Sequence, residues 1–520
     1  MRRSFYVTLL LSVSLTAPAQ SSQKPDAATQ AWWDQTIALS NDKMEGRDTG
    51  TEAYERAAKY VANQFQSAGL KPAGDNGTFF QRVPMHQIDL VPDKSSVEVL
   101  DPQGKVTTTL HFTTEVTTVP REAPISVEAP LIFLGYGMPP ADFDLKGKIA
   151  VFFGNTPAAI PRTDYNTFGV RRLRALTQAG VAAILSIDNP TGTEPFHWPA
   201  AYSRSVTIAG TTTSTPTGPI VIRVNSASID ALFAASGHKP SEIVAAGSNG
   251  ETLANFPLNL TARVHLTTTS KDISSPNILA ILPGSDPKLA SEYVALSAHL
   301  DGYGYGTPVL GDNLYNGTLD DAAYVALLTE LAKDLQHHPP ARSLLFCIFT
   351  GEEKGLLGSA YFTQHLTVPK ESIVADLNLD QLRPIFPLNI LTMEGLTDST
   401  LGEIVRTVAA QFKIEIRPDL EPERRLFSRA DNYNFVRIGV PIASFIFGYD
   451  KGSPEEVAYR EWYARRYHKP QDDIKTPIDW AAAAKFNSFY KVLALAIANA
   501  PNRPQWLPSS PYSPHQTSAQ

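Results

Sequence analysis

Side chains able to bind a metal ion follow several apolar runs in the second half of the 520-residue chain. Each run has the length and the residue types of a buried strand, and in open α/β sheets ligand sites lie beyond the carboxyl ends of the strands. We therefore expect these polar side chains to meet at one edge of a sheet. They are His299, Asp320, Glu352, Glu353, Asp380 and His468.

Each of these residues, taken singly, has an ordinary structural explanation. A histidine after a strand is usually structural, a Glu–Glu pair in a loop is usually solvated, and an aspartate before a helix is usually an N-cap. The N-cap explanation applies most strongly to Asp321 and also to Asp320. Together, however, two histidines and three carboxylates form the mixed nitrogen and oxygen set that zinc accepts, whereas oxygen ligands alone would indicate magnesium or calcium. The spare glutamate of the pair would then be available as a general base.

The elements that must position these side chains are strands and helices that alternate after about residue 274. This alternation predicts an α/β fold, a three-layer sandwich around a mixed, mainly parallel sheet. We expect strands over 277–282, 293–298, 343–349, 373–379 and 442–447, and helices over 322–335 and 479–498.

Changes in composition divide the chain into segments. Residues 24–92 contain an amphipathic helix at about 51–70 and form the N-terminal part of the main domain. Residues 93–266 are rich in short strand-like runs broken by Pro and Gly, which predicts an inserted β-rich α/β domain. The main domain resumes over 267–505, and residues 506–520 are rich in Pro and Ser, which predicts a disordered tail.

The first 19 residues have the features of a secretory signal peptide. Arg2 and Arg3 precede an apolar stretch over residues 5–15, which is too short to span a bilayer, and Ala17-Pro18-Ala19 is a small-x-small cleavage pattern. We expect cleavage near Ala19 and a secreted or periplasmic protein. No later stretch has the ~20 apolar residues of a membrane helix, so no stable membrane insertion is expected.

Charge and cysteine content exclude further possibilities. The 45 Lys and Arg residues face 52 Asp and Glu residues, a net charge of −7, which lacks the basic signature of a nucleic-acid-binding protein. The single cysteine, Cys347, allows no intramolecular disulfide, and its apolar neighbours indicate a buried hydrophobic position. The sequence does not determine the oligomeric state.

Five motifs, in this order, resemble those of the co-catalytic di-zinc aminopeptidases, such as bacterial leucyl aminopeptidases, and their glutamate carboxypeptidase relatives. Upstream, Leu39–Arg47 resembles the N-terminal segment of that family, and the middle region with Gly135-Tyr136-Gly137 resembles the protease-associated (PA) domain that some members carry as an insertion. The motifs are His299-Leu300-Asp301-Gly302, Tyr315 to Asp321, Gly351 to Ser359, Asn378-Leu379-Asp380, and Tyr467 to Asp472.

The resemblance implies a zinc exopeptidase fold that binds two zinc ions per chain. Asp320 would bridge both ions, and the peptide bond that follows it would be cis, as in relatives. Glu353 and His468 would complete one metal site, and His299 and Asp380 would complete the other.

The resemblance also implies roles for three neighbouring residues. Glu352 would take a proton from the bridging water and deliver it to the leaving amine. Asp301 would lie behind His299 as a carboxylate that fixes its tautomer. Tyr467 would be a candidate donor to the developing oxyanion.

Three stretches differ from the family pattern. The family resemblance therefore does not determine the substrate pocket or its specificity. Tyr324 stands where the family commonly has Gly, and Gln381-Leu382-Arg383 and Ala430-Asp431-Asn432 replace two further common motifs. The resemblance implies a metallo-aminopeptidase, a hydrolase that removes N-terminal residues from peptides. The inserted domain would either cover the mouth of the active site or act as a passive spacer.

Relatives of the di-zinc aminopeptidases with other functions are alternatives for this chain. A glutamate carboxypeptidase would need arginines to bind a terminal carboxylate, although each available arginine is better explained as a solvated surface residue. A non-catalytic binding relative is disfavoured because all five ligands and the base are present, and a single-zinc cyclase does not usually carry the insertion. The arginines are Arg383, Arg424, Arg425 and Arg429.

Overall fold

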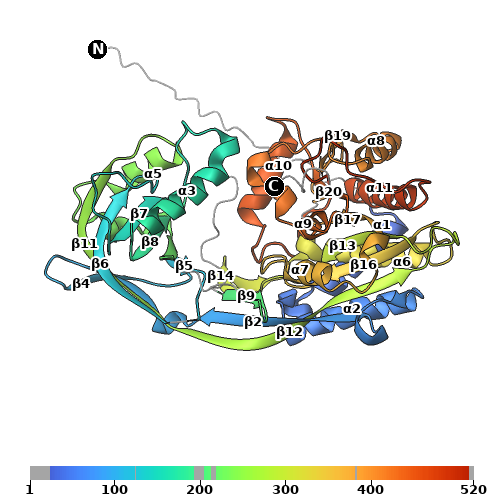
Figure 1. Cartoon of the computed structure of the whole chain (residues 1–520), viewed down its shortest axis with the longest axis horizontal. Coiled ribbons are helices and arrows are strands. Elements are labelled where there is room, and N and C mark those ends of the chain that lie inside the picture. The colour runs from blue at the N-terminus through green and yellow to red at the C-terminus, as the bar shows by residue number, and fades with distance from the viewer. Residues whose placement is uncertain (1–23, 123, 193–203, 212–217, 381–382, 514–520) are drawn as a thin grey trace, which may run out of the picture.

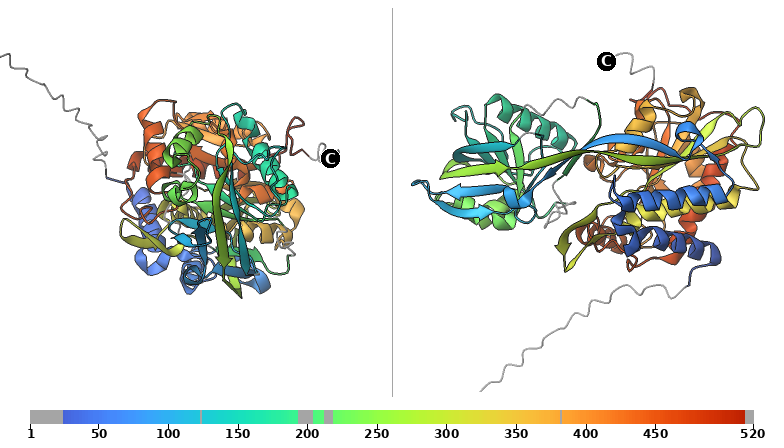
Figure 2. Two further views of the ribbon diagram at one scale, coloured as in Figure 1. Left: turned by 90° about the vertical axis from the view of Figure 1, so that its left-hand side faces the viewer. Right: turned by 90° about the horizontal axis from the view of Figure 1, so that it is seen from below.

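The computed structural model describes residues 24–122, 124–192, 204–211, 218–380 and 383–513. The predicted signal peptide, residues 1–19, and residues 514–520 of the predicted tail lie outside the described residues. The chain forms two lobes that a long antiparallel ribbon joins (Figures 1 and 2).

The larger lobe is built on a ten-stranded mixed sheet. Its central strands β20 (Ile442–Phe447), β17 (Ile373–Asn378), β13 (Tyr293–His299) and β16 (Ser343–Phe349) are parallel, in this order across the sheet. Beyond β16, strands β12 (Thr268–Leu282), β2 (Phe80–Leu90) and β9 (Arg204–Ile208) pair antiparallel, and the short β1 (Lys71–Pro72) pairs with β12. Beyond β20 lie β18 (Ile390–Glu394), which is antiparallel to it, and β19 (Glu415–Arg417). The predicted α/β fold with a mixed sheet is confirmed, and parallel pairing dominates at its centre.

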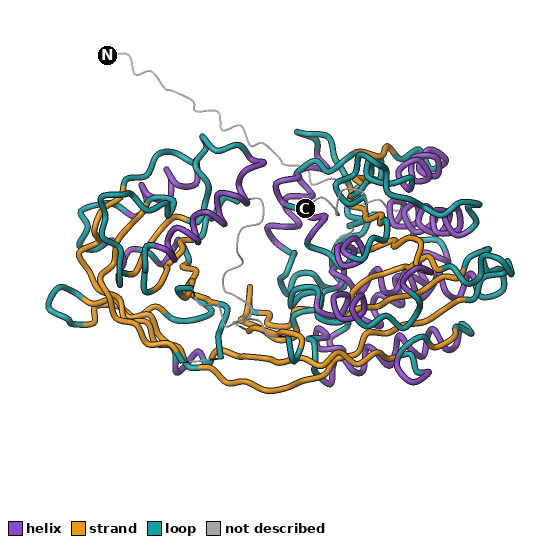
Figure 3. Tube along the Cα trace, in the orientation of Figure 1, coloured by secondary structure: helices purple, strands orange, loops and turns teal. Residues whose placement is uncertain are grey.

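Helices cover both faces of this sheet (Figure 3). Alternate strand residues belong to different cores: Leu344, Phe346 and Ile348 of β16 lie in one, and Leu345 and Cys347 lie in the other. Because successive side chains of a strand point to opposite faces, the lobe has three layers. The first core packs on α1 (Ala27–Ser40), α2 (Glu52–Ser67), α6 (Ala323–Leu335), α8 (Leu401–Gln411), α10 (Pro454–Arg465) and α11 (Trp480–Ala498), and the second on α7 (Leu357–Gln364) and α9 (Asn432–Arg437).

Helix α2 shows why these segments are helical. Thr51 caps its N-terminus by accepting a hydrogen bond from the Tyr54 backbone N–H, and Ala57, Val61 and Phe65 follow at helical spacing on the buried face. The predicted helices at 51–70, 322–335 and 479–498 are present, whereas α1, α8 and α10 were not predicted.

The smaller lobe is an eight-stranded sheet with helices on it. Its order is β4-β3-β11-β6-β7-β8-β10-β5, and two apolar clusters lie against its faces. The lobe corresponds to the segment predicted as an insertion, residues 93–266; its PA-type identity stays a prediction. The elements are β3 (Ser96–Leu100), β4 (Val106–Leu110), β5 (Val116–Thr118), β6 (Ile125–Leu134), β7 (Ile149–Phe153), β8 (Ala183–Ile187), β10 (Ile220–Val224), β11 (Asn255–Leu266), α3 (Tyr165–Gln178), α4 (Asp230–Phe233) and α5 (Pro240–Ser248).

Two strands carry the chain between the lobes. Residues 80–90 of β2 pair with residues 268–278 of β12 along their whole length, and this ribbon runs from one lobe to the other along the lower part of Figure 1. Strand β9 is an exception to the division, because its sequence lies inside the insertion while it pairs with β2 in the main sheet.

The end of the described chain is ordered, so the predicted disordered tail is wrong for residues 506–513. The Trp506 indole donates a hydrogen bond to the Gly439 carbonyl at 2.9 Å, and the Tyr512 ring stacks on Phe427 with centroids 5.0 Å apart. The two aromatic side chains bury apolar area, which offsets the conformational entropy lost by a Pro- and Ser-rich segment.

Among the helices that the structure describes, none is both long and apolar enough to cross a membrane.

Candidate metal site

The predicted site residues meet at the carboxyl edge of the central parallel strands. His299 is the last residue of β13, Asp380 follows β17, and Glu352 and Glu353 follow β16. Two further residues come from outside the strands, because Asp320 lies in the turn before α6 and His468 follows α10. The structure therefore brings together residues that are far apart in sequence, as expected.

The first group of potential ligands contains His299, Asp320 and Asp380, and all three are buried. The His299 Nε2 atom lies 3.3 Å from Asp320 Oδ1 and 3.9 Å from Asp380 Oδ1. Glu352 Oε2 is also 3.9 Å from the same nitrogen, which places the predicted base beside this group.

The second group contains Asp320, Glu353 and His468. The His468 Nε2 atom lies 3.2 Å from Glu353 Oε2 and 3.4 Å from Asp320 Oδ2. Asp320 thus presents Oδ1 to one group and Oδ2 to the other. This is the arrangement that a carboxylate bridging two metal ions requires.

These donor sets fit zinc. Zinc–ligand bonds of about 2.0–2.1 Å in a tetrahedron separate the ligand atoms by about 3.3 Å, close to the shortest separations in each group. Three buried ligand atoms, His299 Nε2, Asp320 Oδ2 and Asp380 Oδ1, have no hydrogen-bond partner among the described residues. Buried polar atoms without partners are costly, and a cation between them removes that cost.

The electrostatics of the site point the same way. Burial raises the pKa of Asp380 to about 7, and the carboxylates of Asp320 and Glu353 add to this increase. Burial lowers the pKa of His468, but Glu353 and Asp320 outweigh that effect and raise the pKa to about 9. The raised pKa values of Asp380 and His468 both indicate an excess of negative charge at the site, which a bound cation would neutralise.

Asp301 contacts His299 through a different atom from the one predicted. The His299 Nδ1 atom lies 3.1 Å from the backbone carbonyl oxygen of Asp301, whereas its distance to the carboxylate is 3.8 Å. A carbonyl can only accept, so Nδ1 carries the proton and Nε2 keeps its lone pair for a metal. The Asp301 carboxylate instead accepts hydrogen bonds from the backbone N–H groups of Glu352 at 3.1 Å and Glu353 at 3.3 Å. The predicted tautomer control therefore belongs to the backbone, and the carboxylate holds the loop of the predicted base.

Neither aspartate before α6 acts as its N-cap. The Asp321 carboxylate accepts a hydrogen bond from the backbone N–H of His299 at 3.1 Å, and no side chain caps the helix. The Asp320–Asp321 peptide bond is cis, as the resemblance implied. Tyr324 turns its ring into the core, where it packs edge-on to Phe486, and it leaves the ligands in place.

Two buried charged residues that were not singled out support the ligand loops. The Asp472 carboxylate accepts from the backbone N–H groups of Leu319 at 3.0 Å and Asp320 at 3.1 Å. Arg47 is fully buried, and it donates to backbone carbonyls of four residues. Both lay inside the motifs used for the resemblance, although their types alone indicated no role. The four acceptors are Leu39, Leu300, Asn316 and Gly317.

Two tyrosines flank His468. The Tyr467 ring stacks on the imidazole with centroids 3.6 Å apart, so its predicted role as an oxyanion donor stays a prediction. The Tyr303 hydroxyl lies 3.1 Å from His468 Nδ1, and Tyr303 lines a small pocket together with Asp320 and Glu353. Sequence reasoning missed Tyr303, which directly follows the His299–Gly302 motif.

The four arginines considered for a terminal carboxylate divide into two pairs. Arg425 and Arg429 are exposed, as expected of surface residues. Arg383 is 1% exposed and lies 3.8 Å from the centroid of the Trp462 ring, so a solvated surface role is wrong for it. Arg424 is also buried along its side chain and donates to Glu421 at 2.9 Å.

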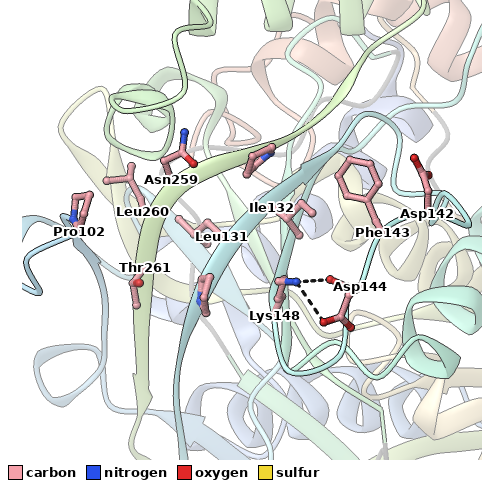
Figure 4. Close-up of a pocket in the computed structure, with 12 residues that line it drawn as sticks. Pro102, Leu131, Ile132, Asp142, Phe143, Asp144, Lys148, Asn259, Leu260 and Thr261 are labelled. Atoms are coloured by element: carbon pink, nitrogen blue, oxygen red, sulfur yellow. Dashed lines mark hydrogen bonds and ion pairs between the residues drawn. The ribbon is translucent and has the colours of Figure 1, made fainter.

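Larger pockets lie outside the ligand groups. One of ≈ 580 Å³ lies between the tip of the hairpin β14 (Gly304–Val309) and β15 (Asp312–Tyr315) and helix α10. Another of ≈ 470 Å³ lies in the smaller lobe between β6 and β11, where Lys148 bonds Asp144 (Figure 4). The lining of the second pocket includes Leu131, Phe143 and Leu260 and none of the predicted ligands.

Comparison with known proteins agrees with this geometry. Residues 277–494 match the model of Peptidase family M28. A probable leucine aminopeptidase 2 from Aspergillus fumigatus is 25% identical over 353 residues, 66% of this chain and 60% of that protein. The chain therefore spans about three fifths of the length of this curated relative.

Solved structures resemble this chain over nearly its whole length. An aminopeptidase from Aneurinibacillus sp. strain AM-1 has a TM-score of 0.58 at 18% identity, with 92% of this chain and 95% of that chain covered. BSAP, a zinc aminopeptidase from Bacillus subtilis, has a TM-score of 0.54 at 18% identity, with 91% and 95% covered. At these identities the likeness establishes the fold, in both lobes.

Proposed function

Because residues 277–494 match the model of Peptidase family M28, we propose that this chain is an exported zinc aminopeptidase that removes N-terminal residues from peptides. The observation that carries the proposal is the position of Asp320. One of its oxygens lies 3.3 Å from His299 Nε2 and the other lies 3.4 Å from His468 Nε2, so a single carboxylate serves two adjacent ligand groups.

The five ligands would hold two zinc ions. His299 and Asp380 would complete one site, Glu353 and His468 the other, and Asp320 would bridge them. Zinc ions bound there supply a Lewis acid for the peptide carbonyl and lower the pKa of a coordinated water, which makes it a nucleophile at neutral pH.

Glu352 is suited to move the proton in this reaction. Its backbone N–H is held by the Asp301 carboxylate at 3.1 Å, and its Oε2 atom lies 3.9 Å from His299 Nε2. As the water oxygen bonds to the carbonyl carbon, the Glu352 carboxylate takes the water proton. It then gives that proton to the nitrogen of the breaking C–N bond, and the amine leaves.

The geometry favours an aminopeptidase over a carboxypeptidase. The free amine of an N-terminal residue needs an acceptor close to the scissile bond, and the buried carboxylates of Glu352 and Asp380 lie there. A carboxypeptidase needs a guanidinium aimed at the substrate, but Arg424 is committed to Glu421 and Arg383 is stacked on Trp462.

Export is part of the proposal and rests on the N-terminal sequence. Arg2, Arg3 and the apolar stretch that follows them support cleavage near Ala19 and a secreted or periplasmic location. Peptides are the proposed substrates, in agreement with the absence of a basic surplus for nucleic acid.

The test is a panel of peptides with free and blocked N-termini, incubated with the purified mature protein. We expect cleavage of the free peptides only, release of the first residue, and loss of the reaction after chelation with recovery on zinc addition. Cleavage of N-blocked peptides from an acidic C-terminus would replace the proposal with a carboxypeptidase. No cleavage of any peptide with zinc present would reject a hydrolytic role.

A further inference from the structure

A strand from the inserted segment lies against the loops of the candidate metal site. Strand β9 pairs with β2 over residues 204–208. Its Val206 packs in an apolar cluster with Met85 of β2 and with Leu357 at the start of α7. Since α7 follows the loop of Glu352 and Glu353, the insertion touches the element that supports that loop.

The first residue of β9, Arg204, is held between two aspartates. Its Nε atom lies 2.6 Å from Asp89 Oδ1 on β2, and its other end bonds Asp48 Oδ2. The second oxygen of Asp48 lies 3.0 Å from the Lys354 ammonium. The side chains of Asp48 and Lys354 are only 10% and 4% exposed, so this carboxylate is shared between two cations in a poorly solvated position.

Lys354 continues the contacts toward the metal ligands. It directly follows Glu353 in the chain, and its ammonium lies 5.1 Å from the centroid of the Tyr303 ring, within cation–π range. The Tyr303 hydroxyl lies 3.1 Å from His468 Nδ1, while Nε2 of the same imidazole faces Glu353 and Asp320. The hydroxyl also lies 3.4 Å from Nε2, and the two ring centroids are 4.7 Å apart, so Tyr303 packs against the imidazole and fixes the orientation of this proposed ligand.

We propose that Arg204 is a positioning residue of the metal site, acting through Asp48 and Lys354 on the Tyr303 hydroxyl that orients His468. The insertion thereby contributes to the hydrolytic centre besides forming the smaller lobe. The inference rests on the proposed function for the identity of the metal and the reaction.

The charges explain why Arg204 matters for this chain of contacts. Arg204 and Lys354 carry two positive charges, and Asp48 and Asp89 carry two negative charges, so the group is neutral. Loss of the guanidinium leaves one positive charge against two negative charges in this group, and it removes the donor from Asp48 Oδ2. Asp48 can then rotate, and the ammonium over Tyr303 is no longer fixed.

The test compares Arg204→Gln with a matched control in the smaller lobe. Arg263 also bridges two carboxylates, with Nε 2.7 Å from Glu128 and a terminal nitrogen 2.8 Å from Glu98, but far from the ligands in sequence and in a different sheet. Zinc affinity is measured by competition with a chelator, and kcat and KM by peptide hydrolysis. We expect Arg204→Gln to lose about tenfold in zinc affinity and in kcat with KM unchanged, and Arg263→Gln to match the wild type.

A second comparison separates positioning from general stabilisation. Tyr303→Phe removes the hydroxyl, so adding Arg204→Gln to it should cost nothing further, whereas independent effects would multiply. Asp89→Asn, which removes only the outer anchor of Arg204, should show a smaller loss of the same kind. Wild-type zinc affinity in Arg204→Gln, or full multiplication in the double variant, would overturn the inference. If the wild type binds zinc but hydrolyses no peptide, the proposed function is rejected. The zinc affinities of Arg204→Gln and the wild type would still test the positioning role of Arg204.

Discussion

Arg47 provides a sharp test of how the ligand loops are held. Its guanidinium donates to the carbonyls of Leu300 at 2.7 Å, Asn316 at 2.7 Å, Gly317 at 2.8 Å and Leu39 at 3.0 Å. Leu300 follows the proposed ligand His299 in the chain, and residues 316–317 precede Asp320, the proposed bridge. One side chain from the N-terminal segment therefore ties two ligand-bearing loops together.

The substitution Arg47→Met keeps much of the side-chain volume and removes all of these donors. Hydrogen bonds to a charged group are worth roughly 1.5–3 kcal/mol each, and they do not add, so the four together are expected to contribute about as much as two such bonds. We expect a loss of about 3–5 kcal/mol, which is a large part of the ~5–15 kcal/mol by which proteins are stable. We also expect zinc affinity to fall about 10–100-fold, because the loops lose their mutual support.

Urea unfolding of the metal-free protein and chelator competition measure the two effects separately. Arg56→Met is the control, because Arg56 lies nearby on α2 with a side chain that is 45% exposed and paired with Glu45, an ion pair worth at most about 1 kcal/mol. Arg47→Lys, with one donor group in place of the planar fork, should fall between the wild type and Arg47→Met. An Arg47→Met protein with the stability and the zinc affinity of the Arg56→Met protein would refute this reasoning.

Three further substitutions test other parts of the account. Glu352→Gln should retain zinc and lower kcat by several orders of magnitude in peptide hydrolysis; turnover near that of the wild type would reject the proton-transfer role. Asp320→Asn should reduce binding at both metal sites together, measured as zinc per chain, and loss of a single ion would count against the bridge. Burial, with Asp419 and Asp398 nearby, raises the pKa of Glu394 to about 8. The folded state therefore binds this proton more tightly than the unfolded state, and stability declines as the pH rises from about 4.5 to 8. Glu394→Gln should raise the melting temperature at pH 9, by the equivalent of at most about 5 kcal/mol, and not at pH 4; an equal shift at both pH values would contradict the assignment.

The sequence contained enough to predict the sheet edge and which side chains meet there. His299, Asp380 and the Glu352–Glu353 pair each follow an apolar strand, and parallel strands bring their carboxyl ends to one edge. This rule depends only on local pattern and chain direction, so it works without knowledge of the packing.

The supporting contacts could not be predicted in this way. Whether the carbonyl or the carboxylate of Asp301 faces the His299 ring depends on the backbone and side-chain torsion angles of a buried loop. Arg47 and Arg204 are common surface residue types, and only the tertiary fold shows that one is buried among carbonyls and the other is held between Asp48 and Asp89. The same holds for Tyr512, whose stacking on Phe427 orders a segment that composition alone predicts to be disordered.

The central claim is that Asp320 joins two metal ions into one hydrolytic centre, and a zinc titration tests it most directly. Metal-free mature protein is titrated with zinc while bound metal and hydrolysis of an N-free peptide are measured on the same samples. The account predicts saturation at two zinc ions per chain, with activity that depends on the bound metal. Failure to bind zinc, or undiminished hydrolysis in the metal-free protein, would contradict it.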